Sequence, residues 1–155
     1  MQSSQSRMDI YRLFDRIAPR CDAFNRVSSL GLDTVWRRRL ARLLKGQNSL
    51  RVLDIATGTG DLLLSLFNAG CPIFSAVGLD LSPRMLEIAG KKLTHRNLAP
   101  KVVLKQADAF SLPFPDASFD VVTCVYRHTH LLIYQPHYRY PHSLKALISI
   151  DIYVP

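Results

Sequence analysis

Residues 51–61 have the sequence RVLDIATGTGD, a short apolar run that ends in a glycine-containing turn. Apolar runs of this length are typical of strands that are buried on both faces of a parallel sheet. Gly58 and Gly60 permit a tight bend and let a ligand approach the backbone closely. The stretch therefore predicts a buried parallel strand followed by a ligand-binding turn.

Strand-like and helix-like segments alternate after this turn. Residues 61–69 carry apolar side chains at helical spacing, and Ser82 and Pro83 form an N-cap and a first-turn proline for a helix that runs to about Leu93. The expected strands are residues 51–56, 74–80, 101–106 and 119–123. This alternation predicts a doubly wound α/β sheet in which the first four strands are recognisable.

Three aspartates stand near the carboxyl ends of the expected strands. Asp54 lies late in the first strand, Asp80 closes the second, and Asp108 follows the third. Ligands of open α/β sheets bind at these ends, so three acids at equivalent positions favour a binding role over simple solvation. Asp80 is placed to accept hydrogen bonds from ribose hydroxyls.

Two classes of cofactor use this architecture, and the turn discriminates between them. A dinucleotide site requires a third glycine, but Leu63 occupies that position. Asp54 and Asp61 flank the turn, and carboxylates repel a pyrophosphate. The same acids suit S-adenosylmethionine, which carries an ammonium and a sulfonium and has no phosphate. A methyl donor is therefore favoured over NAD, and a nicotinamide-dependent oxidoreductase is the less favoured alternative.

Several stretches resemble one known family. Residues 52–61 are similar to the first motif of class I S-adenosylmethionine-dependent methyltransferases, and within them to the UbiE/MenG group of quinone C-methyltransferases. Residues 14–22 with Asn25 resemble that group's N-terminal signature, and residues 78–83 resemble its second motif. The resemblance covers residues 9–124 and continues through Ser29-Leu30-Gly31, Trp36-Arg37, Met85-Leu86, Asp108-Ala109, residues 112–116 and residues 118–120.

The resemblance implies a Rossmann-like class I methyltransferase fold, incomplete after its first strands, with an N-terminal helical cap. The residues that it implies for the donor are Asp54, Gly58, Thr59, Gly60, Asp80, Asp108 and Ala109. The turn residues would hold the methionine portion, Asp80 would bind the ribose, and the last two would border the adenine. The implied reaction is transfer of a methyl group to a ring carbon of demethylmenaquinol or a related polyprenyl quinol.

Quinol methylation at carbon also requires a base that deprotonates the quinol hydroxyl. Asp33 lies where many relatives carry His or Asp and is the candidate, although a helix cap before residues 34–44 explains it equally well. Cys21 departs from the group's usual Tyr beside the expected substrate pocket. No metal is expected, because the histidines at 128, 130, 137 and 142 have no acid or cysteine at ligand spacing.

The net charge of +8 is distributed unevenly along the chain. Residues 1–45 hold ten Lys or Arg and four Asp, residues 46–124 hold seven of each sign, and residues 125–155 hold three bases and one acid. We interpret these segments as the N-terminal helical cap, the S-adenosylmethionine-binding half of a Rossmann-like domain, and an atypical tail.

Residues 36–45 predict a basic amphipathic helix. One face carries Trp36, Leu40, Leu43 and Leu44, and the bases cover the other. Such a helix docks its leucines on the sheet or lies on anionic lipid, where a lipophilic quinol would be found. No aromatic-interleaved RNA-binding motif is present, so nucleic acid is not an expected partner.

The expected location is the cytoplasm, with peripheral contact at the inner membrane surface as an open interpretation. The cysteines form no Cys-x-x-Cys pair, which makes a reducing compartment the default. We see no secretory signal and no apolar stretch that approaches the length of a transmembrane helix.

Residues 125–155 depart from the family pattern. They hold four of the five His and five of the six Tyr, whereas all seven Gly lie at or before Gly90. Our hypothesis is a truncated or frame-shifted C-terminus, in which residues 144–153 are apolar enough to form a substitute edge strand. A truncated, non-catalytic methyltransferase fragment is therefore the alternative to an active enzyme.

Overall fold

The computed structural model of the chain describes residues 16, 18–20, 32–109, 111–115, 118–124 and 147–149, and it describes the side chains of these residues except those of 20, 32–36 and 147–149. Most of the N-terminal signature, Cys21 and the four histidines of the tail lie outside this part of the chain.

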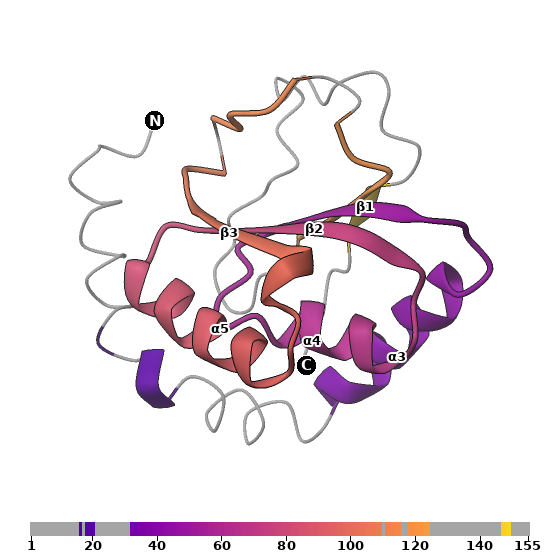
Figure 1. The fold of residues 1–155 in the computed structure, drawn as a ribbon, viewed down its shortest axis with the longest axis horizontal. Coiled ribbons are helices and arrows are strands. Elements are labelled where there is room, and N and C mark those ends of the chain that lie inside the picture. The colour runs from indigo at the N-terminus through magenta and orange to yellow at the C-terminus, as the bar shows by residue number, and fades with distance from the viewer. Residues whose placement is uncertain are drawn as a thin grey trace.

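A parallel sheet forms the centre of the fold (Figure 1). Its strands are β1 (Leu50–Ile55), β2 (Ile73–Asp80), β3 (Val102–Gln106), β4 (Val121–Cys124) and β5 (Leu147–Ser149). They lie in the order β3-β2-β1-β4-β5, and every adjacent pair is parallel. The expected α/β sheet with four strands before residue 125 is confirmed. The short β5 lies within the apolar stretch 144–153.

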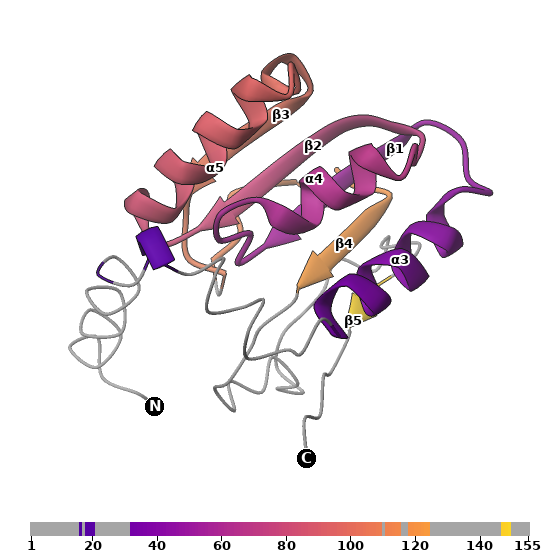
Figure 2. The same ribbon diagram turned by 90° about the horizontal axis from the view of Figure 1, so that it is seen from below.

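Three helices cover one face of this sheet, as Figures 1 and 2 show. They are α3 (Leu32–Leu44), α4 (Asp61–Asn68) and α5 (Pro83–His95), and short 3-10 turns occur at η1 (Ala18–Arg20) and η2 (Ala99–Lys101). The expected N-cap of α5 is confirmed, because the Ser82 hydroxyl accepts a hydrogen bond from the Met85 N–H at 3.1 Å. Across the described ranges, no helix is both long and apolar enough to cross a membrane.

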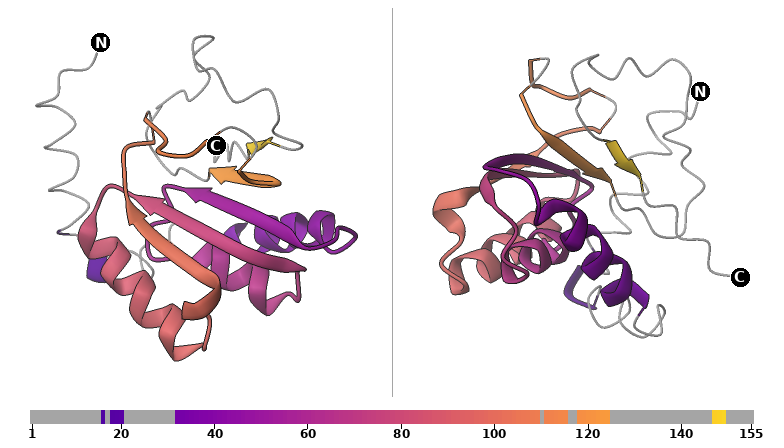
Figure 3. Two further views of the ribbon diagram at one scale, coloured as in Figure 1. Left: turned by 45° about the horizontal axis from the view of Figure 1, so that its top comes forward. Right: turned by 90° about the vertical axis from the view of Figure 1, so that its right-hand side faces the viewer.

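The core has two layers, one on each face of the sheet. The layer between sheet and helices includes Val52, Leu63 and Leu66, which are fully buried. The opposite face carries Leu53, Ile55, Leu79 and Val122 under apolar side chains from the segment that follows β3. Figure 3 shows this segment crossing the face that the helices leave open. The face of the sheet opposite α3, α4 and α5 is thus covered by connecting chain.

Helix α3 docks through a stripe that differs from the expected one. Leu40, Ala41 and Leu44 are buried, but Leu43 is 60% exposed, so the prediction that Leu43 shares the buried face is wrong. Residues at i, i+3, i+4 and i+7 share a helix face, and this spacing joins the three buried residues to Arg37. Arg37 accordingly lies among the residues turned toward the domain, with only 16% of its side chain exposed.

The N-terminal ends of β1 and β4 are tied together by an ion pair. The Arg51 Nε and Nη2 donate to the Asp120 carboxylate at 3.0 and 3.1 Å, and the backbone N–H of each residue bonds to the other at 2.9 Å. Such two-point pairing fixes geometry as well as charge. It sets the β1/β4 register at the end of the sheet that is remote from the glycine-rich turn.

Candidate functional site

The turn between β1 and α4 is a tight, left-handed bend. Ala56, Gly58 and Gly60 have φ values of 57°, 56° and 79°. The Gly60 N–H donates to the Thr57 carbonyl at 3.0 Å, and the Thr57 N–H donates to the Leu79 carbonyl at 2.8 Å. These bonds hold the turn against the carboxyl end of β2.

Asp80 connects this turn to the start of α5. Its Oδ2 accepts a hydrogen bond from the Gly58 N–H at 2.8 Å, and its Oδ1 accepts one from the Ser82 N–H at 2.9 Å. The two oxygens are thereby held in fixed positions, and an ionised carboxylate acts only as an acceptor. A fixed acceptor therefore stands at the carboxyl end of β2.

Asp54 is a buried acid below the turn, with 2% of its surface exposed. The Thr123 hydroxyl of β4 donates to its Oδ1 at 2.7 Å. Burial raises the pKa of Asp54 to about 6, although the Thr123 hydrogen bond favours the ionised form. The side chain is therefore mostly ionised at neutral pH and becomes neutral in mild acid.

The two glycines of the turn serve different purposes. Among the described residues, no atom would lie within 4 Å of a Cβ at Gly58, so open space lies above this backbone. A Cβ at Gly60 would lie 3.2 Å from the Ala89 Cβ of helix α5. Gly58 thus leaves room for a ligand to approach the backbone, whereas Gly60 permits close packing of the turn on the helix.

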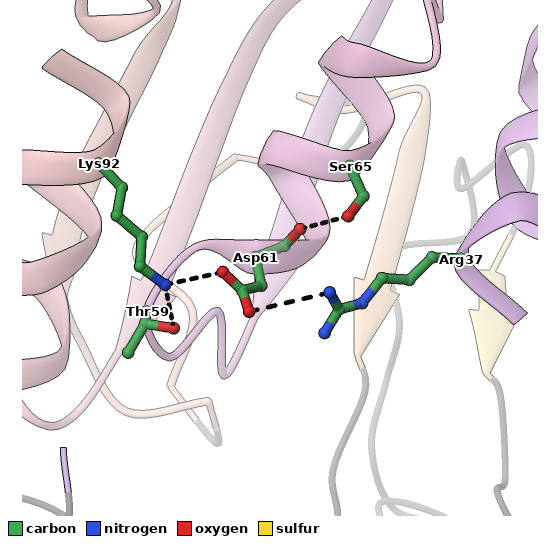
Figure 4. A network of polar contacts seen from close by, with 5 residues as sticks. All are labelled: Arg37, Thr59, Asp61, Ser65 and Lys92. Atoms are coloured by element: carbon green, nitrogen blue, oxygen red, sulfur yellow. Dashed lines mark hydrogen bonds and ion pairs between the residues drawn. The ribbon is translucent and has the colours of Figure 1, made fainter. Parts of the chain in front are cut away.

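A network of polar contacts joins Thr59 and Asp61 to two cationic side chains (Figure 4). The Lys92 ammonium donates to Thr59 Oγ1 at 3.0 Å and to Asp61 Oδ1 at 2.7 Å. The Arg37 Nη1 lies 3.8 Å from Asp61 Oδ2. The Asp61 carboxylate of α4 thus links α3 and α5, and the Lys92 ammonium also bonds to the turn at Thr59.

The segment after β3 reaches the same edge of the sheet. The Ala107 N–H donates to the Asp80 carbonyl at 3.2 Å, which continues the pairing of β2 and β3. Asp108 and Ala109 follow and are half-buried, and Ala109 packs against the core of the open sheet face. Among the described residues, no group of three or more His, Cys, Asp or Glu side chains could hold a metal ion.

The chain matches the ubiE/COQ5 methyltransferase family over residues 1–130. It belongs to this family. The resemblance to the UbiE/MenG group is confirmed.

Curated relatives of this family member carry consistent names. It is 41% identical over 115 residues to the demethylmenaquinone methyltransferase of Lactobacillus johnsonii, covering 74% of this chain and 47% of that protein. It is 46% identical over 114 residues to the protein of the same name from Thermus thermophilus, covering 74% and 50%. It is 38% identical over 117 residues to the ubiquinone/menaquinone biosynthesis C-methyltransferase UbiE of Geotalea uraniireducens, covering 76% and 50%. The chain spans about half the length of the curated relatives that it matches.

Solved structures share the fold of this ubiE/COQ5 family member. A protein of Methanococcus maripaludis assigned as an S-adenosyl-L-methionine-dependent methyltransferase has a TM-score of 0.64 at 20% identity, with 87% of this chain and 63% of that chain covered. The YcgJ protein of Bacillus subtilis has a TM-score of 0.52 at 31% identity, with coverages of 58% and 37%. The expected Rossmann-like methyltransferase fold is confirmed.

The site residues predicted for this family member meet at one edge of the sheet. Asp54, Gly58, Thr59, Gly60 and Asp80 surround the turn, and Asp108 and Ala109 follow the adjacent strand. Asp33, the proposed base, is the second residue of α3, and its side chain lies outside the described part of the chain.

Three contributors to the site were not predicted. Thr123 pairs with Asp54 across the sheet, and Lys92 and Arg37 reach the turn from two helices. Of these three, only Arg37 could have been predicted from the sequence, because its spacing from Leu40 and Leu44 places it on the buried stripe of α3. The other two contacts depend on how helix α5 and strand β4 dock.

Proposed function

We propose that this chain takes part in the S-adenosylmethionine-dependent C-methylation of a polyprenyl quinol, demethylmenaquinol or its ubiquinone-pathway equivalent. The proposal rests on the hydrogen bond that joins the glycine-rich turn to Asp80 at the carboxyl ends of the strands. Family membership and the names of the curated relatives support the same reaction.

The turn has the properties that a methyl donor requires. Open space above Gly58 admits a ligand close to the backbone, and the carboxylates of Asp54 and Asp80 favour a cation over a pyrophosphate. The bound donor would supply a methyl group on a sulfonium, which is already an activated leaving group. The chain's own contribution is then to bind and align the two reactants.

We assign the donor-binding roles as follows. Thr59 and the backbone of Gly58 and Gly60 would hold the methionine portion, with Asp54 beneath them. Asp80 would accept hydrogen bonds from the ribose, because its two oxygens are already oriented by backbone N–H groups. The remaining pair, Asp108 and Ala109, would border the adenine, since they follow the strand next to Asp80.

The acceptor would be a lipophilic quinol, and Asp33 is our candidate for the base that deprotonates it. We assign residues 1–45 to a cap, residues 46–124 to the donor-binding half, and residues 125–155 to an atypical tail. The cap carries Arg38, Arg39, Arg42 and Lys45 as exposed bases beside the exposed Leu43. These residues favour peripheral contact with an anionic membrane, at the inner surface that faces the cytoplasm, over binding to nucleic acid.

The proposal is tested by methyl transfer with the full chain. The chain is incubated with a donor that carries a labelled methyl group and with a reduced demethylmenaquinone in detergent or vesicles. The label is expected in the quinol fraction, and Asp80→Ala is expected to abolish most of it. Donor binding without any transfer to a quinol would instead favour the alternative, a non-catalytic methyltransferase fragment.

A further inference from the structure

Lys92 connects helix α5 to the residues on both sides of Gly60, where the glycine-rich turn meets α4. Its ammonium donates at 3.0 Å to Thr59 and at 2.7 Å to Asp61, the two residues that flank Gly60 in the chain. Lys92 is separated from these residues by 33 and 31 positions of sequence. Figure 4 shows the side chain extending from α5 to the turn. One side chain therefore spans the point at which the turn becomes α4.

The same face of α5 packs directly against the turn. Ala89 lies one helical turn before Lys92, and its Cβ would lie 3.2 Å from a Cβ at Gly60. Ala89 and Leu93 are buried, whereas 25% of the Lys92 side chain is exposed. The end of the turn at Gly60 is thus held by packing on Ala89, and the residues on either side of Gly60 are held by the ammonium.

The neighbouring lysine provides a natural comparison. Lys91 pairs with Glu87 one turn away on the same helix, at 2.6 Å, and its side chain is 73% exposed. A pair of this kind stabilises only the local helix and contributes little. Lys92 instead joins separate elements and bonds to Thr59, whose surface is 5% exposed. Adjacent residues with the same charge therefore have different structural roles.

Charge at the turn supports a role in donor binding. The methionine portion of the donor carries a carboxylate as well as an ammonium, and an uncompensated acid beside Thr59 would repel that carboxylate. Asp61 is the acid next to Thr59, and both its oxygens face cations, Lys92 on one side and Arg37 on the other. The network therefore compensates one negative charge while it holds the turn in shape.

We propose that Lys92 is a positioning residue for the methyl-donor site, which shapes the glycine-rich turn through Thr59 and Asp61 so that it receives the amino-acid portion of the donor. The inference rests on the proposed function. Lys92 acts through Thr59, so it affects the part of the donor that the turn holds. The ribose and adenine, assigned to Asp80 and to the segment after β3, do not depend on it.

The test compares Lys92→Met with Lys91→Met in the full chain. Each variant removes one positive charge from α5 and keeps a long apolar side chain, so the net charge is matched. Calorimetric titration is carried out with S-adenosylhomocysteine and with 5′-methylthioadenosine, which lacks the amino-acid portion. Lys92→Met is expected to lower the affinity for S-adenosylhomocysteine by about tenfold or more, equivalent to about 1.4 kcal/mol. Its affinity for 5′-methylthioadenosine is expected to change less than about twofold.

Two outcomes would overturn the inference. If Lys92→Met lowered the affinities for both ligands equally, Lys92 would only stabilise the fold. Equal behaviour of Lys92→Met and Lys91→Met would mean that the contacts with the turn do not matter. Lys91→Met is expected to leave both affinities unchanged, and Lys92→Arg is expected to restore part of the lost affinity because it keeps the charge.

Amide hydrogen exchange tests the same role without a ligand. In Lys92→Met the Gly60 N–H, which donates to Thr57, is expected to exchange faster than in the wild type, whereas Lys91→Met leaves it unchanged. Unchanged exchange in Lys92→Met would contradict the inference even if the donor binds. Failure of the wild-type chain to bind any donor would instead overturn the proposed function, so the two failures are distinguishable.

Discussion

Replacement of Asp54 by asparagine removes a buried carboxylate whose pKa is raised by burial from 3.8 to about 6. Asparagine has nearly the same shape, and its carbonyl oxygen still accepts the hydrogen bond from the Thr123 hydroxyl. The substitution therefore isolates the effect of the charge. Its consequence for stability depends on pH, and the direction follows from the sign of the pKa change.

The folded state of the wild type holds its proton on Asp54 more tightly than the unfolded state. Below about pH 3 both states are protonated, and the stabilisation associated with this difference is fully present. As the pH rises to about 6, the unfolded state loses its proton first, and the folded state is destabilised relative to it. The pKa difference corresponds to a loss of about 3 kcal/mol that is complete above about pH 7.

Urea unfolding followed by circular dichroism measures this loss. The free energy of unfolding of Asp54→Asn minus that of the wild type is expected to rise by about 3 kcal/mol between about pH 3 and about pH 7. Glu87→Gln is the control, because Lys91 lowers the pKa of Glu87 and any pH-dependent difference has the opposite sign. A difference between Asp54→Asn and the wild type that stays constant over this range would mean that folding does not raise the pKa of Asp54.

Three further substitutions have defined outcomes. Gly60→Ala places a Cβ on a residue with φ 79°, at 3.2 Å from the Ala89 methyl group. It is expected to lower the free energy of unfolding by about 1–2 kcal/mol or more. Gly46→Ala, whose Cβ would meet no described atom within 4 Å, is expected to stay within about 0.5 kcal/mol of the wild type. Leu63→Ala, at a fully buried position, is expected to cost about 2–5 kcal/mol in the same urea assay, and the exposed Leu43→Ala should cost little. Asp80→Ala is expected to weaken donor binding by at least about tenfold in calorimetry, because the N–H groups of Gly58 and Ser82 lose their acceptor. An unchanged affinity would mean that Asp80 is not part of the donor site.

The elements of the fold were predictable because local patterns determine them. The apolar runs and the Ser82-Pro83 start of α5 identify strands and helix at the observed places. The ends differ by one or two residues for physical reasons. Strand β1 ends at Ile55, where Ala56 adopts φ 57°. Strand β4 begins at Val121, after Asp120, whose side chain accepts the hydrogen bond from the Arg51 N–H.

The acids of the site were predictable from topology alone. Parallel strands present their carboxyl ends at one edge, so Asp54 and Asp80 had to converge there. The partners of these acids could not be predicted in the same way. The bonds from Thr123 to Asp54 and from Lys92 to Asp61 join residues 69 and 31 positions apart, and they depend on strand register and helix docking that no local pattern encodes.

The docking face of α3 illustrates a further limit. Counting leucines placed Leu43 on the buried stripe, whereas the i, i+3, i+4 and i+7 spacing assigns that stripe to Arg37, Leu40, Ala41 and Leu44. An arginine on a buried stripe contradicts the usual binary pattern of apolar and polar faces. It becomes understandable only when Asp61 on α4 is known to lie 3.8 Å away.

Binding of a methyl donor by the turn around Gly58 can be measured in one titration. The full wild-type chain is titrated calorimetrically with S-adenosylmethionine at neutral pH. One donor is expected to bind per chain, with a dissociation constant in roughly the micromolar range that is typical of enzyme substrates. The absence of detectable binding at donor concentrations of about 1 mM would contradict it.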